Sequence, residues 1–274
     1  MLQAMLHGKL TREEEGMEDL LTSNTFGLMT YLPPDALLLL FLSEACSPSL
    51  DKLPAQFCAD VIEIERWHFW PPLQYPGCAF CEPDVVLILR HRDGSRTGVL
   101  IEVKYRSGMS SLASDVDERP KAQLAREYDN LRALARDEGL ARFAVIYLTT
   151  DCVCPREEVE ESVEEYRNKR GHLPEIYWLS WRTLAALLQR KGAERTPIME
   201  DLYALFLHLD LTTFCQLRYP GLGMPSWRFA VDVRWVWSIP NIAWSFAIPG
   251  QAIEPRFGWM LPTSLSHLYQ WRRS

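Results

Sequence analysis

The sequence contains no hydrophobic run long enough to cross a membrane. The longest run extends from Ala36 to Leu42, whereas a membrane-spanning helix needs roughly 20 apolar residues. The N-terminus also lacks the basic region and apolar stretch of a secretory signal. Seven cysteines, an odd number, are more typical of reduced thiols than of a disulfide framework. We therefore expect no membrane partner and a cytoplasmic location.

An excess of basic residues is also missing. The 29 Lys and Arg residues face 36 Asp and Glu residues, giving a net charge of −7, which argues against a protein that coats nucleic acid by bulk electrostatics. The chain has no phosphate loop, no dinucleotide-binding glycine motif and no Gly-x-Ser-x-Gly motif. Because much of the acid is concentrated in residues 13–19 and 157–165, local basic patches can still bind an acidic substrate.

The composition changes near residue 195. Residues 196–274 contain six Arg, no Lys, five acidic residues and six of the ten tryptophans. We therefore predict one domain over residues 1–195 and an aromatic-rich accessory region over residues 196–274. Within that region, the alternation from Trp227 to Ile248 favours a β-hairpin.

Hydrophobic spacing predicts an α/β protein with the element order ααββαβαβα. The expected helices cover residues 11–32, 34–45, 117–139, 156–169 and 181–189, and the expected strands cover residues 85–89, 99–105, 143–148 and 175–179.

Three polar side chains interrupt the apolar hairpin that the first two strands form. Glu102 and Lys104 are two residues apart and share one face, because strand side chains alternate. A two-residue Asp93-Gly94 loop would place Asp84 opposite Val103, on the wrong face. We therefore predict an odd-numbered loop or a bulge. Asp84 would then lie opposite Lys104, with Val86 opposite Glu102.

Carboxylates on neighbouring strands are suitable ligands for Mg²⁺, which prefers oxygen. A nearby lysine can orient an attacking water or balance developing negative charge. These are the requirements of metal-assisted phosphodiester hydrolysis.

The segments Glu82-Pro83-Asp84-Val85-Val86 and Leu100-Ile101-Glu102-Val103-Lys104 resemble the PD-(D/E)XK nuclease superfamily, in its RecB-like variant. The resemblance covers roughly residues 11–190. It implies a restriction-endonuclease-like αβββαβ core, a mixed sheet flanked by helices, here followed by a Trp-rich C-terminal extension. It also implies Mg²⁺ as cofactor, with Mn²⁺ able to replace it.

By the same resemblance, Asp84 and Glu102 bind metal, and Lys104 acts on the attacking water. Glu18 resembles the first-helix glutamate that completes the metal site, and Gln123 resembles the helix glutamine of RecB-like members. The tyrosine of that pattern stands one residue closer to the glutamine than Tyr128 does here. Glu18 in a solvated helix start and Gln123 in an exposed first turn are the alternative interpretations.

The resemblance implies a Mg²⁺-dependent DNA endonuclease in a prokaryotic restriction or anti-phage defence system. DNA is the expected partner, together with a protein partner or a second copy bound through the C-terminal aromatic region. The alternative is a catalytically inactive nuclease-like module that scaffolds a nucleic-acid-processing complex.

Two weaker patterns remain. A four-thiolate zinc site could form from Cys78, Cys81, Cys152 and Cys154. Basic residues near the hairpin and on the helix that contains Gln123 either bind phosphates or form a solvated face. They are Arg90, Arg92, Arg96, Arg106, Lys121, Arg132 and Arg136.

Overall fold

The computed structural model describes residues 18–105, 119–212, 226–229, 234–239 and 242–247. The chain divides into two compact units, Met1–Phe214 and Cys215–Ser274. Among the described residues, no helix combines the length and apolar character needed to cross a membrane.

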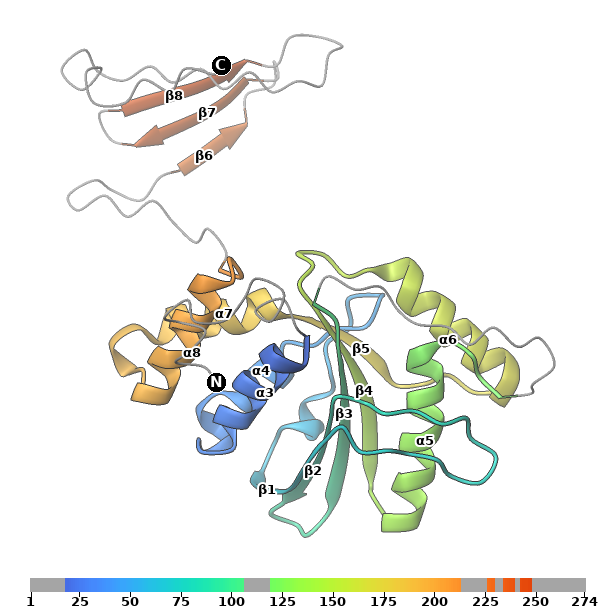
Figure 1. The fold of residues 1–274 in the computed structure, drawn as a ribbon. Coiled ribbons are helices and arrows are strands. Elements are labelled where there is room, and N and C mark those ends of the chain that lie inside the picture. Colours follow the sequence, from blue (N-terminus) through green and yellow to red (C-terminus); the bar gives the residue numbers. More distant parts are fainter. Residues whose placement is uncertain (1–17, 106–118, 213–225, 230–233, 240–241, 248–274) are drawn as a thin grey trace. The chain divides into compact units, whose positions relative to one another are not determined.

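A five-stranded mixed sheet in the order β1-β2-β3-β4-β5 forms the centre of the first unit (Figure 1). The first three strands are antiparallel neighbours, whereas β3, β4 and β5 run parallel. Helices connect the parallel strands, as such crossovers require. The strands are β1 (Val61–Phe69), β2 (Val85–His91), β3 (Arg96–Val103), β4 (Arg142–Thr149) and β5 (Ile176–Ser180).

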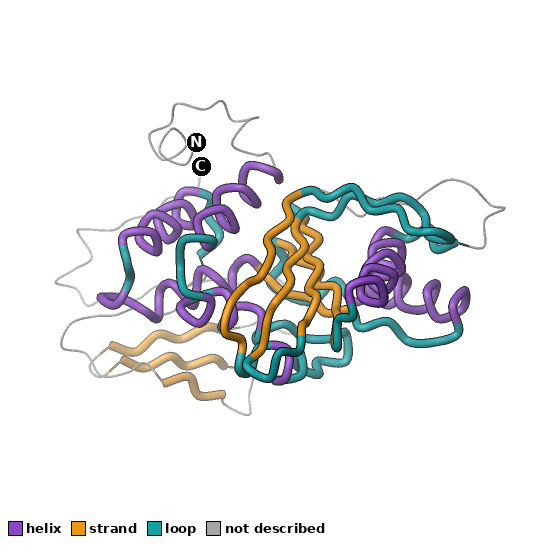
Figure 2. Tube along the Cα trace, turned by 90° about the horizontal axis from the view of Figure 1, so that it is seen from below, coloured by secondary structure: helices purple, strands orange, loops and turns teal. Residues whose placement is uncertain are grey.

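Helices cover both faces of this sheet (Figures 1 and 2). One face packs against α3 (Glu18–Met29), α4 (Leu38–Leu42), α7 (Trp181–Lys191) and α8 (Pro197–His208). The other packs against α5 (Gln123–Glu138) and α6 (Arg156–Arg170). Short 3₁₀ helices occupy Pro34–Ala36, Ala55–Phe57 and Gly192–Glu194. The predicted α/β class, with a mixed sheet flanked by helices, is confirmed.

Successive side chains of the central strands point to opposite faces of the sheet, so each face has its own hydrophobic core. Val85 and Leu87 pack in the cluster that contains fully buried Trp181, while Val86 packs with Leu124 of α5 on the opposite face. Both faces of β2 and β3 are therefore apolar, which is why these strands appear in the sequence as continuous hydrophobic runs.

The first strand, β1, was not predicted from the sequence. It lies at the edge of the sheet, and its residues are partly or fully exposed. Its pairing with β2 is irregular between Val61 and Glu63 and between Ile64 and Arg66. Such bulges shift side chains from one face to the other, so the two-residue alternation that identifies a strand is lost.

Two predicted helix boundaries were wrong. The helix expected over residues 117–139 begins at Gln123 as α5, and the described residues 119–122 precede it outside the helix. The helix expected over 34–45 is divided into a 3₁₀ turn and the short helix α4. Leu37 separates them with a ψ of −50° but an extended φ of −149°, which interrupts regular helical geometry.

The domain boundary predicted at residue 195 lies too early. Helix α8 follows that residue and buries Leu202, Leu205 and Phe206 in the same cluster as Phe26 of α3 and Trp181 of α7. The division falls after Phe214, because the apolar face of α8 needs this core. The change in composition near residue 195 therefore precedes the division between the two units and does not coincide with it.

The second unit contains a three-stranded antiparallel sheet rather than a single hairpin. Its order is β6 (Ser226–Phe229), β7 (Arg234–Ile239) and β8 (Ile242–Ala247). The aromatic side chains expected to form a docking surface lie outside the described side chains, so that expectation stays a prediction.

The loop between β2 and β3 has three residues, Arg92–Gly94. The His91 N–H donates to Ser95 O at 2.9 Å, and the Gly94 N–H donates to His91 O at 3.0 Å. Gly94 has a φ of 82°, as the last position of such a loop requires. The predicted odd loop is confirmed, but the partners were wrong by two residues. Val86 pairs with Leu100 rather than with Glu102, so the register brings Asp84 beside Glu102.

Replacing Gly94 with alanine should lower the free energy of unfolding by about 1 kcal/mol, because a Cβ disfavours the left-handed backbone. Nothing lies within 4 Å of the position that this Cβ would occupy, so the effect comes from the backbone alone. Gly94→Asn should cost less, since asparagine tolerates this conformation. Urea unfolding of the three proteins measures the difference; equal stability of Gly94→Ala and wild type would contradict it.

Leu205→Ala tests whether α8 belongs to the first unit. The side chain of Leu205 is fully buried, so the truncation should cost about 2 to 5 kcal/mol. Leu207 on the same helix is 49% exposed, and Leu207→Ala is the matched control, with an expected change within about 0.5 kcal/mol. Similar urea midpoints for the two variants would mean that α8 does not pack as described.

Candidate active site

The residues singled out by the sequence come together at the carboxyl end of β3. This end of the strand lies beside the start of β2, and the N-terminal residues of α3 and α5 reach it from opposite faces of the sheet. In sheets with parallel strands, ligands commonly bind outside the carboxyl ends of those strands. Four segments that are distant in the sequence therefore contribute to one site.

Asp84 is fixed at this end of the sheet by two donors. Its Oδ2 accepts a hydrogen bond from the Val103 N–H at 2.8 Å, and its Oδ1 accepts one from the Trp70 indole at 3.2 Å. The Trp70 N–H also donates to Asp84 O at 3.0 Å. Trp70 has a φ of 48°, which is unfavourable for a bulky side chain and is typical of functional sites. Sequence reasoning missed Trp70.

Lys104 links two carboxylates from different parts of the chain. Its Nζ lies 2.6 Å from Glu102 Oε1 and 3.3 Å from Glu18 Oε1. The second oxygen of Glu18 accepts a hydrogen bond from the Tyr105 N–H at 2.8 Å. Glu18 is therefore tied to the end of β3 and is not merely part of a solvated helix start.

Gln123 also points into the site. Its Nε2 donates a hydrogen bond to Glu102 Oε1, the same oxygen that contacts Lys104. This contact replaces the alternative in which Gln123 lies in an exposed first turn. Asp84, Glu102, Lys104, Glu18 and Gln123 are thus all brought together as the sequence predicted, although contact alone does not assign their chemical roles.

Sequence reasoning missed Glu127, which lies one helical turn after Gln123 on α5. Glu127 is only 1% exposed, and its carboxyl group lies beside that of Glu102. The Oε2 atoms of both residues have no hydrogen-bond partner among the described residues. A proton shared by the two carboxyl groups would satisfy both of them. The i, i+4 spacing from Gln123 could have revealed Glu127.

Burial dominates the electrostatics of these acids. It raises the pKa of Asp84 to about 7, with a further contribution from the charge of Glu102 and opposition from the Val103 N–H and Lys104. Burial likewise raises the pKa of Glu102, although Lys104 lowers it. For Lys104 the balance is reversed: burial lowers the pKa, but Glu102, Glu18 and Asp84 outweigh it, so the pKa is raised. The ammonium therefore stays charged.

The donor chemistry of the site is suitable for Mg²⁺, although the ligands are not yet arranged around one point. Among the described residues, no three His, Cys, Asp or Glu side chains are grouped as they would be around a metal ion. The Lys104 ammonium lies between Glu18 and Glu102 and satisfies their oxygens. The carboxylate oxygens match the preference of Mg²⁺, and Glu102 Oε2 is buried without an N–H donor from the described chain.

The four cysteines considered for zinc do not meet. Cys78 and Cys81 are buried beside each other, and the Cys78 thiol donates to Asp129 O of α5 at 3.6 Å. Cys154 lies instead beside Cys46, and Cys152 is exposed. The structure thus offers no four-thiolate arrangement for them.

Three of the seven basic residues suggested as phosphate ligands contact other side chains. Arg90 forms an ion pair with Glu63 at 2.6 Å, and Arg96 pairs with Glu65 at 3.3 Å. Arg132 contacts His172 at 3.5 Å. Arg106 lies outside the described residues. These contacts favour the interpretation of a solvated or ion-paired surface.

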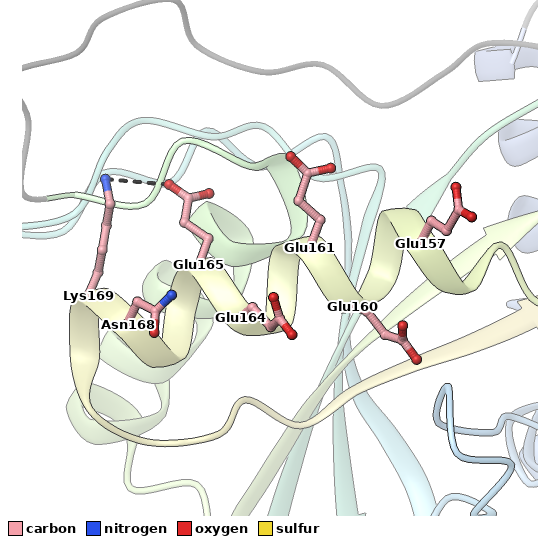
Figure 3. A pocket seen from close by; sticks show the side chains of 7 residues that line it. All are labelled: Glu157, Glu160, Glu161, Glu164, Glu165, Asn168 and Lys169. Carbon is pink, nitrogen blue, oxygen red and sulfur yellow. Dashed lines mark ion pairs between the residues drawn. The ribbon is translucent and has the colours of Figure 1, made fainter.

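An acidic cavity of about 590 Å³ on α6 contains none of the predicted site residues (Figure 3). Its residue Glu165 accepts hydrogen bonds from the N–H groups of Lys121 and Ala122 at 2.8 and 2.7 Å. Burial raises the pKa of Glu165, but these two bonds and Lys169 outweigh it, so the pKa is lowered. Glu165 therefore anchors the segment that leads into α5.

Comparisons of the chain with family models, with curated proteins and with solved structures found no match. The interpretation of the site therefore depends on its own geometry and chemistry.

Glu127→Gln tests the shared proton. The folded chain raises the pKa of Glu127 well above 4.5, so Glu127 should destabilise the folded state progressively as the pH rises above that value. Glutamine keeps a donor for Glu102 and an acceptor for Gln123 but cannot ionise. In EDTA, we expect the two proteins to have similar urea midpoints near pH 4.5 and the variant to be more stable at pH 8.

Each pKa unit between the folded and unfolded states corresponds to about 1.4 kcal/mol. Glu157→Gln, on the exposed acidic face of α6, is the control and should show no such divergence. If the stability of Glu127→Gln parallels that of wild type across this pH range, no proton is held between Glu102 and Glu127.

Proposed function

We propose that the protein is a metal-dependent nuclease that hydrolyses DNA phosphodiester bonds. One observation carries the proposal: Asp84, Glu102 and Lys104 converge on one side of a sheet end. Glu18 and Gln123 reach the same point from two helices. These are the residues for which the sequence resembles PD-(D/E)XK nucleases.

The connectivity also supports the proposal. The segments α3, β1, β2, β3, α5 and β4 follow one another in the first unit, with the short helix α4 after α3. This order agrees with the αβββαβ core that the resemblance implies. A role in prokaryotic restriction or anti-phage defence follows from the resemblance alone, as does action with a protein partner or a second copy through the C-terminal aromatic region.

A bound Mg²⁺ ion would supply positive charge to the phosphate and make water more acidic. Asp84, Glu102 and Glu18 are the residues that would hold it. Glu18 and Glu102 already contact the Lys104 ammonium, which an ion held by these carboxylates would have to displace. Release of Lys104 from these carboxylates would leave a cation on a strand end, where it can hold a water or a phosphate oxygen.

Gln123 and Glu127 have supporting positions in this proposal. Both contact the Glu102 carboxyl group, and neither is adjacent to it in the sequence. Hydrogen bonds to a ligating carboxylate fix its orientation, and their loss commonly weakens a metal site. Helix α5 therefore positions Glu102 from outside the sheet.

A catalytically inactive scaffold is the second candidate. It is favoured by the ion pairs of Lys104 with Glu102 and Glu18, which partly neutralise the acids without an ion. The lack of a ready group of three ligands in the described chain agrees with it. Cleavage assays separate the two candidates.

Plasmid DNA incubated with the protein and Mg²⁺ or Mn²⁺ should be cut, and EDTA should prevent cutting. Asp84→Ala and Lys104→Ala should each lower the rate by roughly 100-fold or more, because each removes a group that acts on the reacting phosphate or water. Gel analysis of nicked and linear products measures the rate. Lys52→Ala removes an exposed lysine paired with Glu44 and should leave the rate unchanged.

Removal of one partner from a buried ion pair can cost about 3 to 5 kcal/mol, so thermal melting must show that Lys104→Ala is folded at the assay temperature. Glu102→Gln is a gentler companion variant, and its Mn²⁺ affinity can be measured by calorimetry. Cleavage by Asp84→Ala at the wild-type rate would exclude the site. Absence of cleavage and of metal binding in wild type would favour the scaffold.

A further inference from the structure

Arg126 on α5 is a buried arginine for which the described residues provide no side-chain hydrogen bond or ion pair. Its side chain belongs to a residue only 8% exposed, and its Nε has no hydrogen-bond acceptor in the described chain. No ion pair joins its guanidinium to any described carboxylate. Arg66 and Arg170, by contrast, pair with Glu138 and Asp129.

A buried guanidinium with no counter-charge is unfavourable, because it loses hydration without gaining an ion pair. Arginine cannot avoid this cost by losing its proton, because the guanidinium stays charged in proteins. The folded chain therefore keeps a positive charge that its described residues do not use. An anionic ligand would balance it.

The position of Arg126 connects this charge to the candidate active site. Arg126 is three residues after Gln123 and next to Glu127, so the three side chains share one side of α5. Burial most strongly raises the pKa of the Cys81 thiol, and the charges that then act on it are Glu127, Arg126 and Glu102. Cys81 lies in the segment that leads to Asp84, so Arg126, Glu127 and Glu102 are all near this segment.

We infer that Arg126 binds a phosphate group of the nucleic-acid substrate next to the acids of the site, an inference that rests on the proposed nuclease function. The planar guanidinium has a fork of donors that matches two phosphate oxygens. The site itself has Glu18, Asp84, Glu102 and Glu127 around Lys104, a set that would otherwise repel a phosphate. Arg126 compensates for this repulsion at the side of α5.

Sequence reasoning missed Arg126 because nothing in the sequence distinguishes it from the other arginines of the chain. Arg90 and Arg96 are already paired with glutamates, so a phosphate would have to displace these partners. Arg126 needs no such exchange, and burial in the protein strengthens its attraction for an anion.

The test compares Arg126→Met with Arg136→Ala. Methionine fills much of the same space without charge, and Arg136 is an exposed arginine on the same helix. Binding of a short fluorescein-labelled DNA duplex and of the matching single strand is followed by anisotropy, in EDTA and in Ca²⁺. Arg126→Met should weaken binding about tenfold or more, and Arg136→Ala should change it by less than about twofold.

Thermal melting in EDTA gives a second readout without nucleic acid. Inorganic phosphate should raise the melting temperature of wild type more than that of Arg126→Met, with chloride at equal ionic strength as the control. Without ligand, Arg126→Met should melt no lower than wild type, because it removes an unpaired buried charge. Arg126→Lys keeps the charge but loses the fork, and should bind DNA with intermediate affinity if Arg126→Met does not fold.

Equal binding by wild type and Arg126→Met, or equal losses in Arg126→Met and Arg136→Ala, would overturn the inference. Failure of wild type to bind duplex, single strand or phosphate would overturn it too. Arg126-dependent binding of DNA by a protein that cuts nothing with any divalent ion would remove the nuclease proposal and leave the phosphate contact in place.

Discussion

The register of one hairpin determines which side chains can meet at the candidate site. The three-residue loop Arg92–Gly94 closes β2 on β3 so that residues whose numbers have the same parity share a face. A loop one residue shorter would turn Asp84 away from Glu102 and would also move Val86 out of the core beneath α5. Packing and chemistry therefore depend on the same turn, and the left-handed Gly94 is the residue that makes it.

Buried charge is the main physical cost of this arrangement. Four carboxyl groups surround one ammonium at the end of β3, and burial raises the pKa values of three of them, Asp84, Glu102 and Glu127. A fold selected for stability alone would gain by replacing such groups with apolar ones. Buried acids with raised pKa values are typical of functional sites.

Helix α5 contributes more to the site than the sequence indicated. It presents an amide to Glu102 through Gln123, a carboxyl group through Glu127 and, through Arg126, a guanidinium that pairs with no carboxylate of the described chain. Its start is anchored by Glu165 of α6, so the two helices on this face of the sheet together set the position of Glu102. The proposed site thus takes Asp84 and Glu102 from the ends of two paired strands, and Glu18, Gln123 and Glu127 from two helices, so that rigid elements hold all of them.

The sequence by itself determined the α/β class, the buried strands, the shared face of Glu102 and Lys104, and the need for an odd loop before Asp84 could join them. These follow from helix and strand periodicity and from turn geometry, which depend on neighbouring residues. Only the tertiary structure decided the rest: the edge strand β1, the place of α8 in the first core, the burial of Glu127 beside Glu102, and the burial of Arg126 without an ion pair in the described chain. These features arise because residues far apart in the chain are packed together. Which side chains are buried, and which hydrogen-bond or ion-pair partners they have, depends on that packing. Neither can be predicted from neighbouring residues in the sequence.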